Sequence, residues 1–159
     1  MQASLVFFQR EEDPKIVYDF STYAYANAPS DVVFRGAEFQ WKNHLSDAID
    51  YRINYTYISL KDGTMIRLPK HTVNGLMNFK VNENSQFTLT YMYQGKRQAV
   101  DQSSLDAYQL VDFRYTRSFL NPQLQAYVWL TNLFDTEYVE ITDFTTKGRN
   151  FMLGVTYRY

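Results

Sequence analysis

The side chains in this sequence best suited to chemistry are aromatic rings and charges in its longer connecting segments. Phenol and guanidinium groups bind ligands by stacking, cation–π contacts and hydrogen bonds, without covalent chemistry. The candidates for such contacts are Tyr23, Tyr25, Arg97, Tyr138 and Phe144. Each of them also fits a solvated loop residue, so the pattern predicts a binding surface and assigns no individual role.

Covalent catalysis is not predicted. It needs an activated nucleophile beside a base, and the sequence contains no Cys and only two histidines, His44 and His71. His44 falls in a predicted short turn, and His71 near the start of a predicted strand at the opposite rim. We therefore expect no catalytic residue and no cofactor.

Four carboxylates crowd the segment 134–149, namely Asp135, Glu137, Glu140 and Asp143. Carboxylate oxygens are suitable ligands for Ca²⁺. Their spacing follows no calcium-binding rule, however, so the expected state is a solvated acidic loop without a metal.

Composition narrows the class of protein. Lys and Arg number 16 against 17 Asp and Glu, which argues against a nucleic-acid binder. The 14 Tyr, 12 Phe and 2 Trp favour a membrane–water interface, although a soluble aromatic-rich β-domain also fits. The longest apolar run, residues 5–8, is far below the ~20 residues of a membrane-spanning helix. The first residues do not form a signal peptide, so an outer-membrane chain would be a mature form or a fragment.

The elements that position the candidate residues are predicted strands. In the segment 49–57, apolar residues such as Ile53 and Tyr55 alternate with polar ones such as Arg52 and Asn54. Similar alternation, noisier in places, predicts eight strands and no helix. The strands cover about 3–10, 31–42, 49–57, 70–81, 86–94, 111–117, 123–132 and 151–159.

The connections alternate between short and long. The short ones, rich in Asn, Ser and Pro, are 43–46, 82–85 and 120–122. The long ones are 11–30, 60–69, 97–106 and 134–149. A transmembrane β-barrel has short periplasmic turns and longer extracellular loops, and strands of about ten residues fit its span. The pattern therefore favours such a barrel.

The polar face of the predicted strands is too charged for a dry core. Residues such as Glu38, Asp50 and Arg52 would each need a buried partner. Facing a wet lumen they cost little, so the apolar face is predicted to point outward to lipid. A soluble lipocalin-like barrel is the alternative, but it would not explain the asymmetry of the connections.

The last third of the sequence carries a specific motif. Asn132-Leu133-Phe134-Asp135 and Tyr138 are followed by Gly148-Arg149-Asn150-Phe151 and a strand ending at Tyr159. This resembles the closing signature of TonB-dependent receptors, with Lys147 where most members have Pro. Phe34-Arg35-Gly36-Ala37-Glu38 and Arg67-Leu68-Pro69-Lys70-His71 resemble two earlier stretches of that family, so the resemblance covers nearly the whole chain.

The resemblance implies a fold and a function. These receptors are 22-stranded barrels with a plugged lumen, so residues 1–159 would be the last third of the barrel, an all-β antiparallel meander without the plug. The receptor would sit in the bacterial outer membrane and import a siderophore complex, cobalamin or a similar nutrient. Its partners would be lipid, the plug and remaining barrel, and the TonB complex, but no nucleic acid.

The end of the sequence resembles the signal that the barrel assembly machinery recognises, carried here by Gly154, Tyr157 and Tyr159. Any lipid-facing strand would show similar alternation. A free-standing eight-stranded outer-membrane barrel also remains open as an alternative, because eight strands can close around a filled interior.

Overall fold

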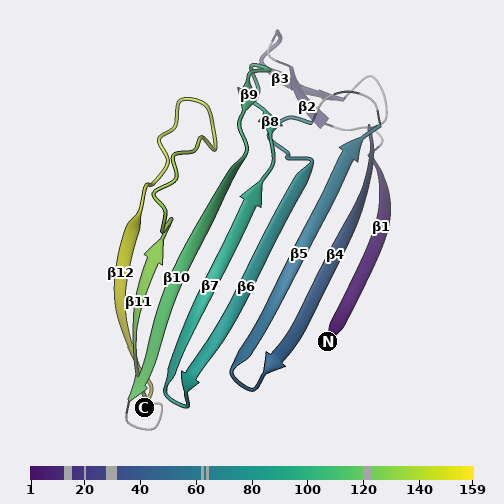
Figure 1. Ribbon diagram of the computed structural model, residues 1–159. Coiled ribbons are helices and arrows are strands. Elements are labelled where there is room, and N and C mark those ends of the chain that lie inside the picture. Colours follow the sequence, from purple (N-terminus) through teal and green to yellow (C-terminus); the bar gives the residue numbers. More distant parts are fainter. Residues whose placement is uncertain (13–15, 20, 28–31, 62, 64, 120–122) are drawn as a thin grey trace.

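The chain forms one antiparallel sheet of eight strands (Figure 1). This computed structural model describes residues 1–12, 16–19, 21–27, 32–61, 63, 65–119 and 123–159. The strand order is β1-β4-β5-β6-β7-β10-β11-β12. Their bounds are β1 Gln2–Glu12, β4 Val32–Ser46, β5 Ile49–Leu60, β6 His71–Asn82, β7 Ser85–Gln94, β10 Tyr108–Phe119, β11 Leu124–Thr131 and β12 Asn150–Tyr157. The predicted all-β meander is confirmed.

Two small hairpins were not predicted. β2 (Ile16–Asp19) pairs with β3 (Ala24–Asn27), and β8 (Arg97–Gln98) pairs with β9 (Ser104–Leu105). Both fall within connections predicted to be long and lie at the same end of the sheet in Figure 1. Within the described residues, no helix has the length and apolar character needed to cross a bilayer.

The short connections agree only in part with the turns predicted from the sequence. The turn predicted at 82–85 is present at residues 83–84, where Asn82 Oδ1 accepts a hydrogen bond from the Asn84 amide at 2.9 Å. The turn predicted at 43–46 was wrong. A register shift between His44 and Ser46 lengthens β4, and the chain reverses at residues 47–48 beside the Ser46 hydroxyl. The third predicted turn, 120–122, lies outside the described residues.

The strand register places apolar residues side by side across one face. One such row runs through Ile49, Phe79, Phe87, Tyr115, Val128 and Leu153. Within it the rings of Phe87 and Tyr115 are 4.9 Å apart. Nearer the long connections, Tyr55 and Tyr57 lie against His71. The face thus carries aromatic residues toward both ends of its strands.

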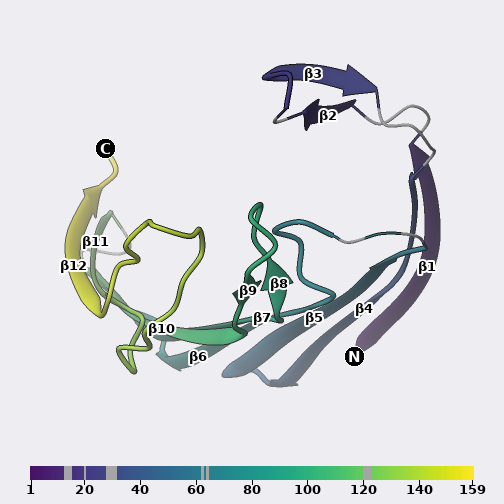
Figure 2. The ribbon, with the colours of Figure 1, turned by 90° about the horizontal axis from the view of Figure 1, so that it is seen from above.

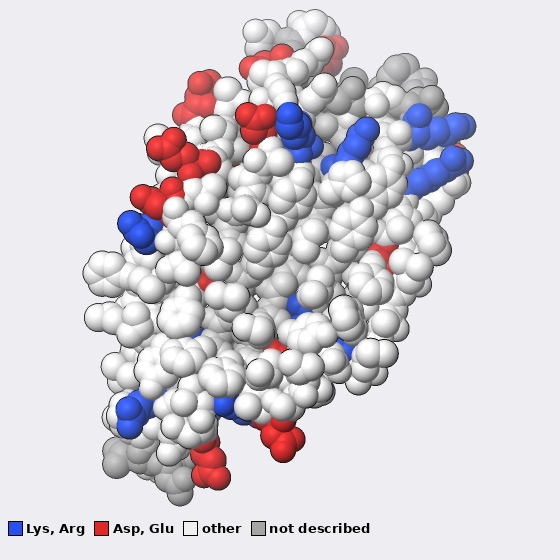
Figure 3. Space-filling model, in the orientation of Figure 1, with Lys and Arg blue, Asp and Glu red and all other residues white. Residues whose placement is uncertain are grey.

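The sheet is an open, curved wall (Figure 2). Its edge strands are β1 and β12, and they do not pair with each other in the described residues, so the described chain does not form a closed eight-stranded barrel. Figure 3 views the convex side, where Lys, Arg, Asp and Glu gather toward the two ends and leave a largely uncharged band between them. This is the face on which the register collects the apolar rows, as the alternation predicted.

Polar side chains on the opposite face bond to one another across strands. Asn78 Nδ2 donates to Asp50 Oδ2 at 3.0 Å, and Asn78 Oδ1 accepts from Thr88 Oγ1 at 2.9 Å and from Gln86 Nε2 at 3.1 Å. We call Asp50, Asn78, Gln86 and Thr88 the polar ladder. It links β5, β6 and β7 without an apolar core, which agrees with a hydrated concave face.

Most of the deeply buried apolar side chains lie at the end of the sheet that carries the long connections. Met65, Ala99, Leu105 and Tyr108 are each at most 9% exposed. They belong to the segments between β5 and β6 and around β8 and β9. The tightest packing among the described residues therefore orders the loops rather than the wall.

Candidate functional site at the long-loop rim

Three connecting segments meet over the concave side of the sheet, and we call this region the loop rim. They are residues 65–70, the β8–β9 hairpin and residues 132–149 (Figures 1 and 2). The first two are joined by a hydrogen bond from the Arg67 amide to the Gln98 carbonyl at 2.7 Å. The hairpin and the last segment are joined through Arg97, so the rim forms one connected surface.

Arg97 holds two of these segments together. Its side chain leaves β8, and Nη2 donates to the Val139 carbonyl at 2.9 Å. The guanidinium carbon also lies 5.1 Å from the centroid of the Tyr108 ring, which is a cation–π contact. Arg97 is only 8% exposed, and its Nε has no partner among the described residues. Its contacts are those of a residue that orders the rim.

Tyr138 completes this cluster. Its ring lies 4.5 Å from that of Tyr108, so Arg97, Tyr108 and Tyr138 form a continuous stack of side chains. Burial, and then the negative charges of Glu140 and Asp112, raise the pKa of the Tyr138 phenol. The hydroxyl therefore stays protonated at neutral pH and available as a hydrogen-bond donor.

Two of the hollows at the rim carry opposite charge. The first, of about 430 Å³, is lined by three cations, Lys70, Lys96 and Arg97, together with uncharged residues that include Met65. The second, of about 660 Å³, is lined by Tyr138, Phe144 and the three carboxylates Asp106, Asp135 and Glu137. Lys96 and Asp106 approach to 3.8 Å where the hollows adjoin. Volumes of this size suit small-molecule ligands.

Comparison with known proteins identifies the family of this chain. Residues 1–133 match a family model described as "TonB dependent receptor-like, beta-barrel". The chain belongs to the TonB-dependent receptor β-barrel family. No curated protein matches its sequence.

Solved receptors share this fold. The structure of the ferripyoverdine receptor of the outer membrane of Pseudomonas aeruginosa, bound to ferripyoverdine, matches 98% of this chain with a TM-score of 0.75 and 20% identity. The siderophore receptor PiuA of Acinetobacter baumannii matches 99% with a TM-score of 0.78 and 18% identity. The import receptor Fiu of E. coli K12 matches 96% with a TM-score of 0.73 and 15% identity. The chain spans about a quarter of their lengths, 24%, 26% and 24% respectively.

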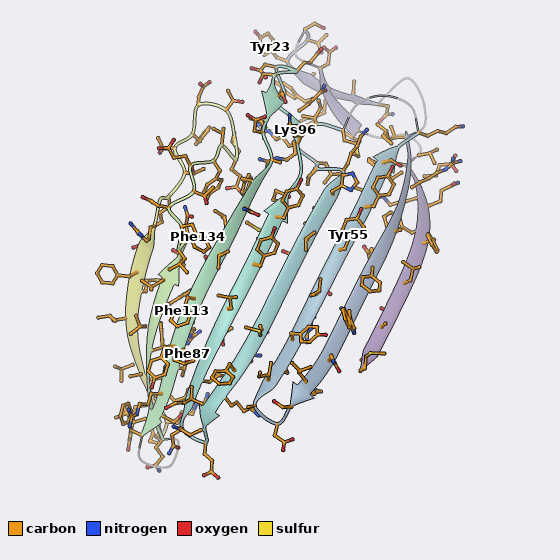
Figure 4. All side chains as sticks on the ribbon, in the orientation of Figure 1. Tyr23, Tyr55, Phe87, Lys96, Phe113 and Phe134 are labelled. Carbon is orange, nitrogen blue, oxygen red and sulfur yellow. The ribbon has the colours of Figure 1, made fainter. Side chains whose placement is uncertain are left out.

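In this receptor segment the five predicted ligand-contact residues fall into two groups. Arg97 and Tyr138 belong to one side-chain stack, and Phe144, 69% exposed, lines the same hollow as Tyr138. Tyr23 and Tyr25 lie on the separate β2–β3 hairpin, and both are more than three-quarters exposed. Figures 2 and 4 place this hairpin at the same end of the sheet but across the open concave side.

The receptor motif beginning at Asn132 closes the base of the last loop. Asn132 is 5% exposed and has φ +49°. Its amide donates to the carboxylate of Asp112 at 2.9 Å, and its side chain exchanges two 2.9 Å hydrogen bonds with the backbone of Thr136. Leu133 continues the contact with β10, where its amide donates to the Val111 carbonyl. By contrast, Phe134 is 71% exposed (Figure 4).

The two halves of the closing signature meet at Asp135. Its Oδ1 accepts a hydrogen bond from the Arg149 amide at 2.7 Å. A Cβ atom at Gly148 would lie 2.9 Å from the same oxygen, so the glycine makes room for the carboxylate. The sequence suggested Asp135 only as part of a motif and an acidic loop; the structure gives it this loop-closing contact.

Other motif residues lie on the wall. Arg35 Nε donates to Gln9 Oε1 at 3.0 Å across β1 and β4. A Cβ atom at Gly36 would overlap the ring of Phe8 and the Tyr57 carbonyl, and Glu38 faces Thr56 across β4 and β5. Gly154 and Tyr157 belong to β12, whereas Tyr159 follows it and is fully exposed.

The residues considered for catalysis or metal binding are dispersed. His44 lies near the end of β4, and His71 begins β6 at the other end of the sheet, where its Nδ1 is 2.9 Å from the Tyr55 hydroxyl. No three His, Asp or Glu side chains are grouped to hold a metal ion within the described parts of the chain.

Three residues of the rim were missed by the sequence analysis. Tyr108, Lys70 and Lys96 were not selected as candidates, yet they complete the ring stack and the cation-lined hollow. The available signal was their position, because each stands beside a boundary between a strand and a long connection. In an antiparallel meander, residues at such boundaries lie together at one rim of the sheet.

Proposed function

We propose that this chain is the C-terminal part of the barrel of an outer-membrane receptor that imports a scarce nutrient, of which an iron–siderophore complex is the best supported. The observation that carries the proposal is the antiparallel wall of this chain, which has the fold of the family. Its long connections meet at one rim, and the hollows of that rim have the size of a small-molecule ligand. The solved neighbours bear names that include siderophore receptor and ferripyoverdine receptor. The closing signature at Asn132–Tyr138 and Gly148–Phe151 supports the C-terminal placement.

The rim supplies non-covalent contacts to the nutrient. The cation-lined hollow at Lys70, Lys96 and Arg97 suits the anionic oxygens of a ferric chelate, because ammonium and guanidinium groups form strong hydrogen bonds with charged oxygen. Tyr138 and Phe144 offer rings beside it, and Tyr23 and Tyr25 approach from the other side of the lumen. We assign no covalent step and no catalytic residue to this process.

The remaining parts of the receptor perform the transport. A plug inside the barrel, contacted by polar residues of the concave face, would move when TonB supplies energy. The apolar convex face would contact lipid, and the barrel assembly machinery would insert the chain by recognising the terminal residues Gly154, Tyr157 and Tyr159. Cobalamin is the second nutrient class to be tested.

The test uses the complete receptor that contains this segment, expressed in cells with and without TonB. Uptake of iron-labelled ferripyoverdine and of labelled cobalamin is measured for the native receptor and for Lys96→Gln together with Lys70→Gln. We expect TonB-dependent uptake of the ferric chelate and a loss of affinity of about tenfold in the double variant. If neither nutrient is taken up, the import function is contradicted. Uptake in cells without TonB would contradict TonB as the energy source.

A further inference from the structure

A groove on the convex face lies near the ends of β10 and β12 and the start of β11, away from the loop rim. It has a volume of about 380 Å³ and a largely apolar lining that includes Tyr115, Arg117, Phe119, Ala126, Leu153 and Val155. Ala126 forms its floor, because in the strand register it stands between Arg117 on one side and Val155 on the other. The larger side chains of Tyr115, Leu153 and Phe119 form the walls.

The charge in this groove is unusual for its face. Among the described residues of six strands, β5, β6, β7, β10, β11 and β12, the convex face carries a single charged residue, Arg117. No carboxylate lies within ion-pair distance of it in the described part of the chain. Its guanidinium carbon lies 5.3 Å from the centroid of the Phe119 ring. The cation therefore has an aromatic neighbour and no counter-ion from the protein.

The position of Arg117 along the strand fits a membrane interface. It stands two residues before the end of β10, about 7 Å from the strand terminus. A long side chain at this depth extends its charge to the headgroup layer while its methylene groups stay against apolar surface. A phosphate at that level would supply the missing negative charge.

We propose that this groove binds one glycerophospholipid molecule from the membrane leaflet at the end of the sheet opposite the loop rim. The phosphate would bond to Arg117, and one acyl chain would lie over Ala126 between Tyr115 and Leu153. Leu153 and Val155 are 70% and 71% exposed, so the acyl chain would cover apolar surface that is open in the segment. The inference rests on the outer-membrane location proposed above, but it concerns the face opposite to the lumen.

The test measures lipid binding to the complete receptor in detergent by native mass spectrometry. The probes are phosphatidylglycerol and a diacylglycerol with the same acyl chains, which lacks the phosphate. We expect phosphatidylglycerol to bind about tenfold more tightly to the native receptor. Arg117→Gln should remove this preference, and Ala126→Leu should weaken the binding of both probes because it fills the floor of the groove.

Two matched variants act as controls. Lys80→Gln removes a cation at a similar depth on the concave face, and Ala37→Leu enlarges an alanine of the convex face near the other end of the strands. Both should bind lipid like the native receptor. The proposal is overturned if all variants bind lipid equally or if all of them lose lipid binding equally. It is also overturned if the groove instead holds a second copy of the receptor. Ferripyoverdine binding measured on the same samples separates this outcome from failure of the import function.

Discussion

The ring of Tyr127 on β11 lies over the backbone of Gly154 on β12, in the space where any other residue would place its Cβ atom. The ring also contacts β10, because the Arg114 guanidinium carbon lies 4.1 Å from the ring centroid. Gly154 therefore has a packing role in the wall. Its place in the terminal motif has a steric reason that does not depend on recognition by another protein.

Gly154→Ala is expected to destabilise the receptor by about 1–3 kcal/mol, because the added methyl overlaps the Tyr127 ring and displaces it from Arg114. The measurement is the urea midpoint of the refolded receptor in detergent, followed by its mobility on unheated gels. Gly75→Ala is the control, since its Cβ would lie 3.5 Å from the nearest atom, the Cβ of Tyr91, an ordinary contact. Equal midpoints for the two variants would contradict the steric account.

The orientation of the wall predicts different tolerance at neighbouring residues. Tyr55→Arg should block insertion, because it places a charge among the apolar residues of the convex face, where a charge costs up to about 4 kcal/mol depending on its depth (Figure 4). Asn54→Arg should be tolerated, because Asn54 faces the polar side and bonds to Gln40 at 2.9 Å. The amount of receptor in outer-membrane fractions measures both. Similar yields for the two variants would refute the assignment of faces.

Loop closure by Asn132 gives a third prediction. Asn132→Ala removes both side-chain bonds to Thr136, so a non-glycine residue at φ +49° keeps only its backbone hydrogen bonds, a cost of about 2–3 kcal/mol. Hydrogen exchange of residues 133–149 should accelerate while that of β6 and β7 stays unchanged. Phe134→Ala, in the same motif but at an exposed position, should leave exchange unchanged. Acceleration in both variants would mean that the motif acts as a whole.

The terminal aromatic residue can be tested separately from packing. Tyr159 follows β12 and makes no hydrogen bond among those described, so its deletion should not alter the stability of receptor that has already folded. If the assembly machinery reads this residue, outer-membrane yield should fall severalfold while the urea midpoint of purified receptor stays the same. Unchanged yield would exclude Tyr159 from the assembly signal.

The wall was predictable from sequence because its strands are long and have two unlike faces. In β5, for example, Ile53 and Tyr55 alternate with Arg52 and Asn54 over enough residues to reveal the period. The β8–β9 hairpin was not predictable, since two-residue strands show no period. The turn after β4 was misplaced because a bulge near His44 continues the strand through residues that usually form turns.

The candidate site was predictable only as a set of loop residues. Arg97 and Tyr138 were both selected, but their connection depends on Tyr108 and on the Val139 carbonyl, which lies 42 residues beyond Arg97. Such contacts follow from the packing of loops against one another, and no local pattern encodes them. For the same reason, the sequence did not separate the cation-lined hollow from the acidic one.

The polar ladder has a mechanical consequence. Asp50, Asn78, Gln86 and Thr88 tie three adjacent strands through side chains, at right angles to the strand axes and in addition to the backbone bonds. Sliding one strand past the next would break both sets together, so this part of the wall resists shear. A load applied inside the lumen would then move whatever the wall encloses before it deformed the wall itself.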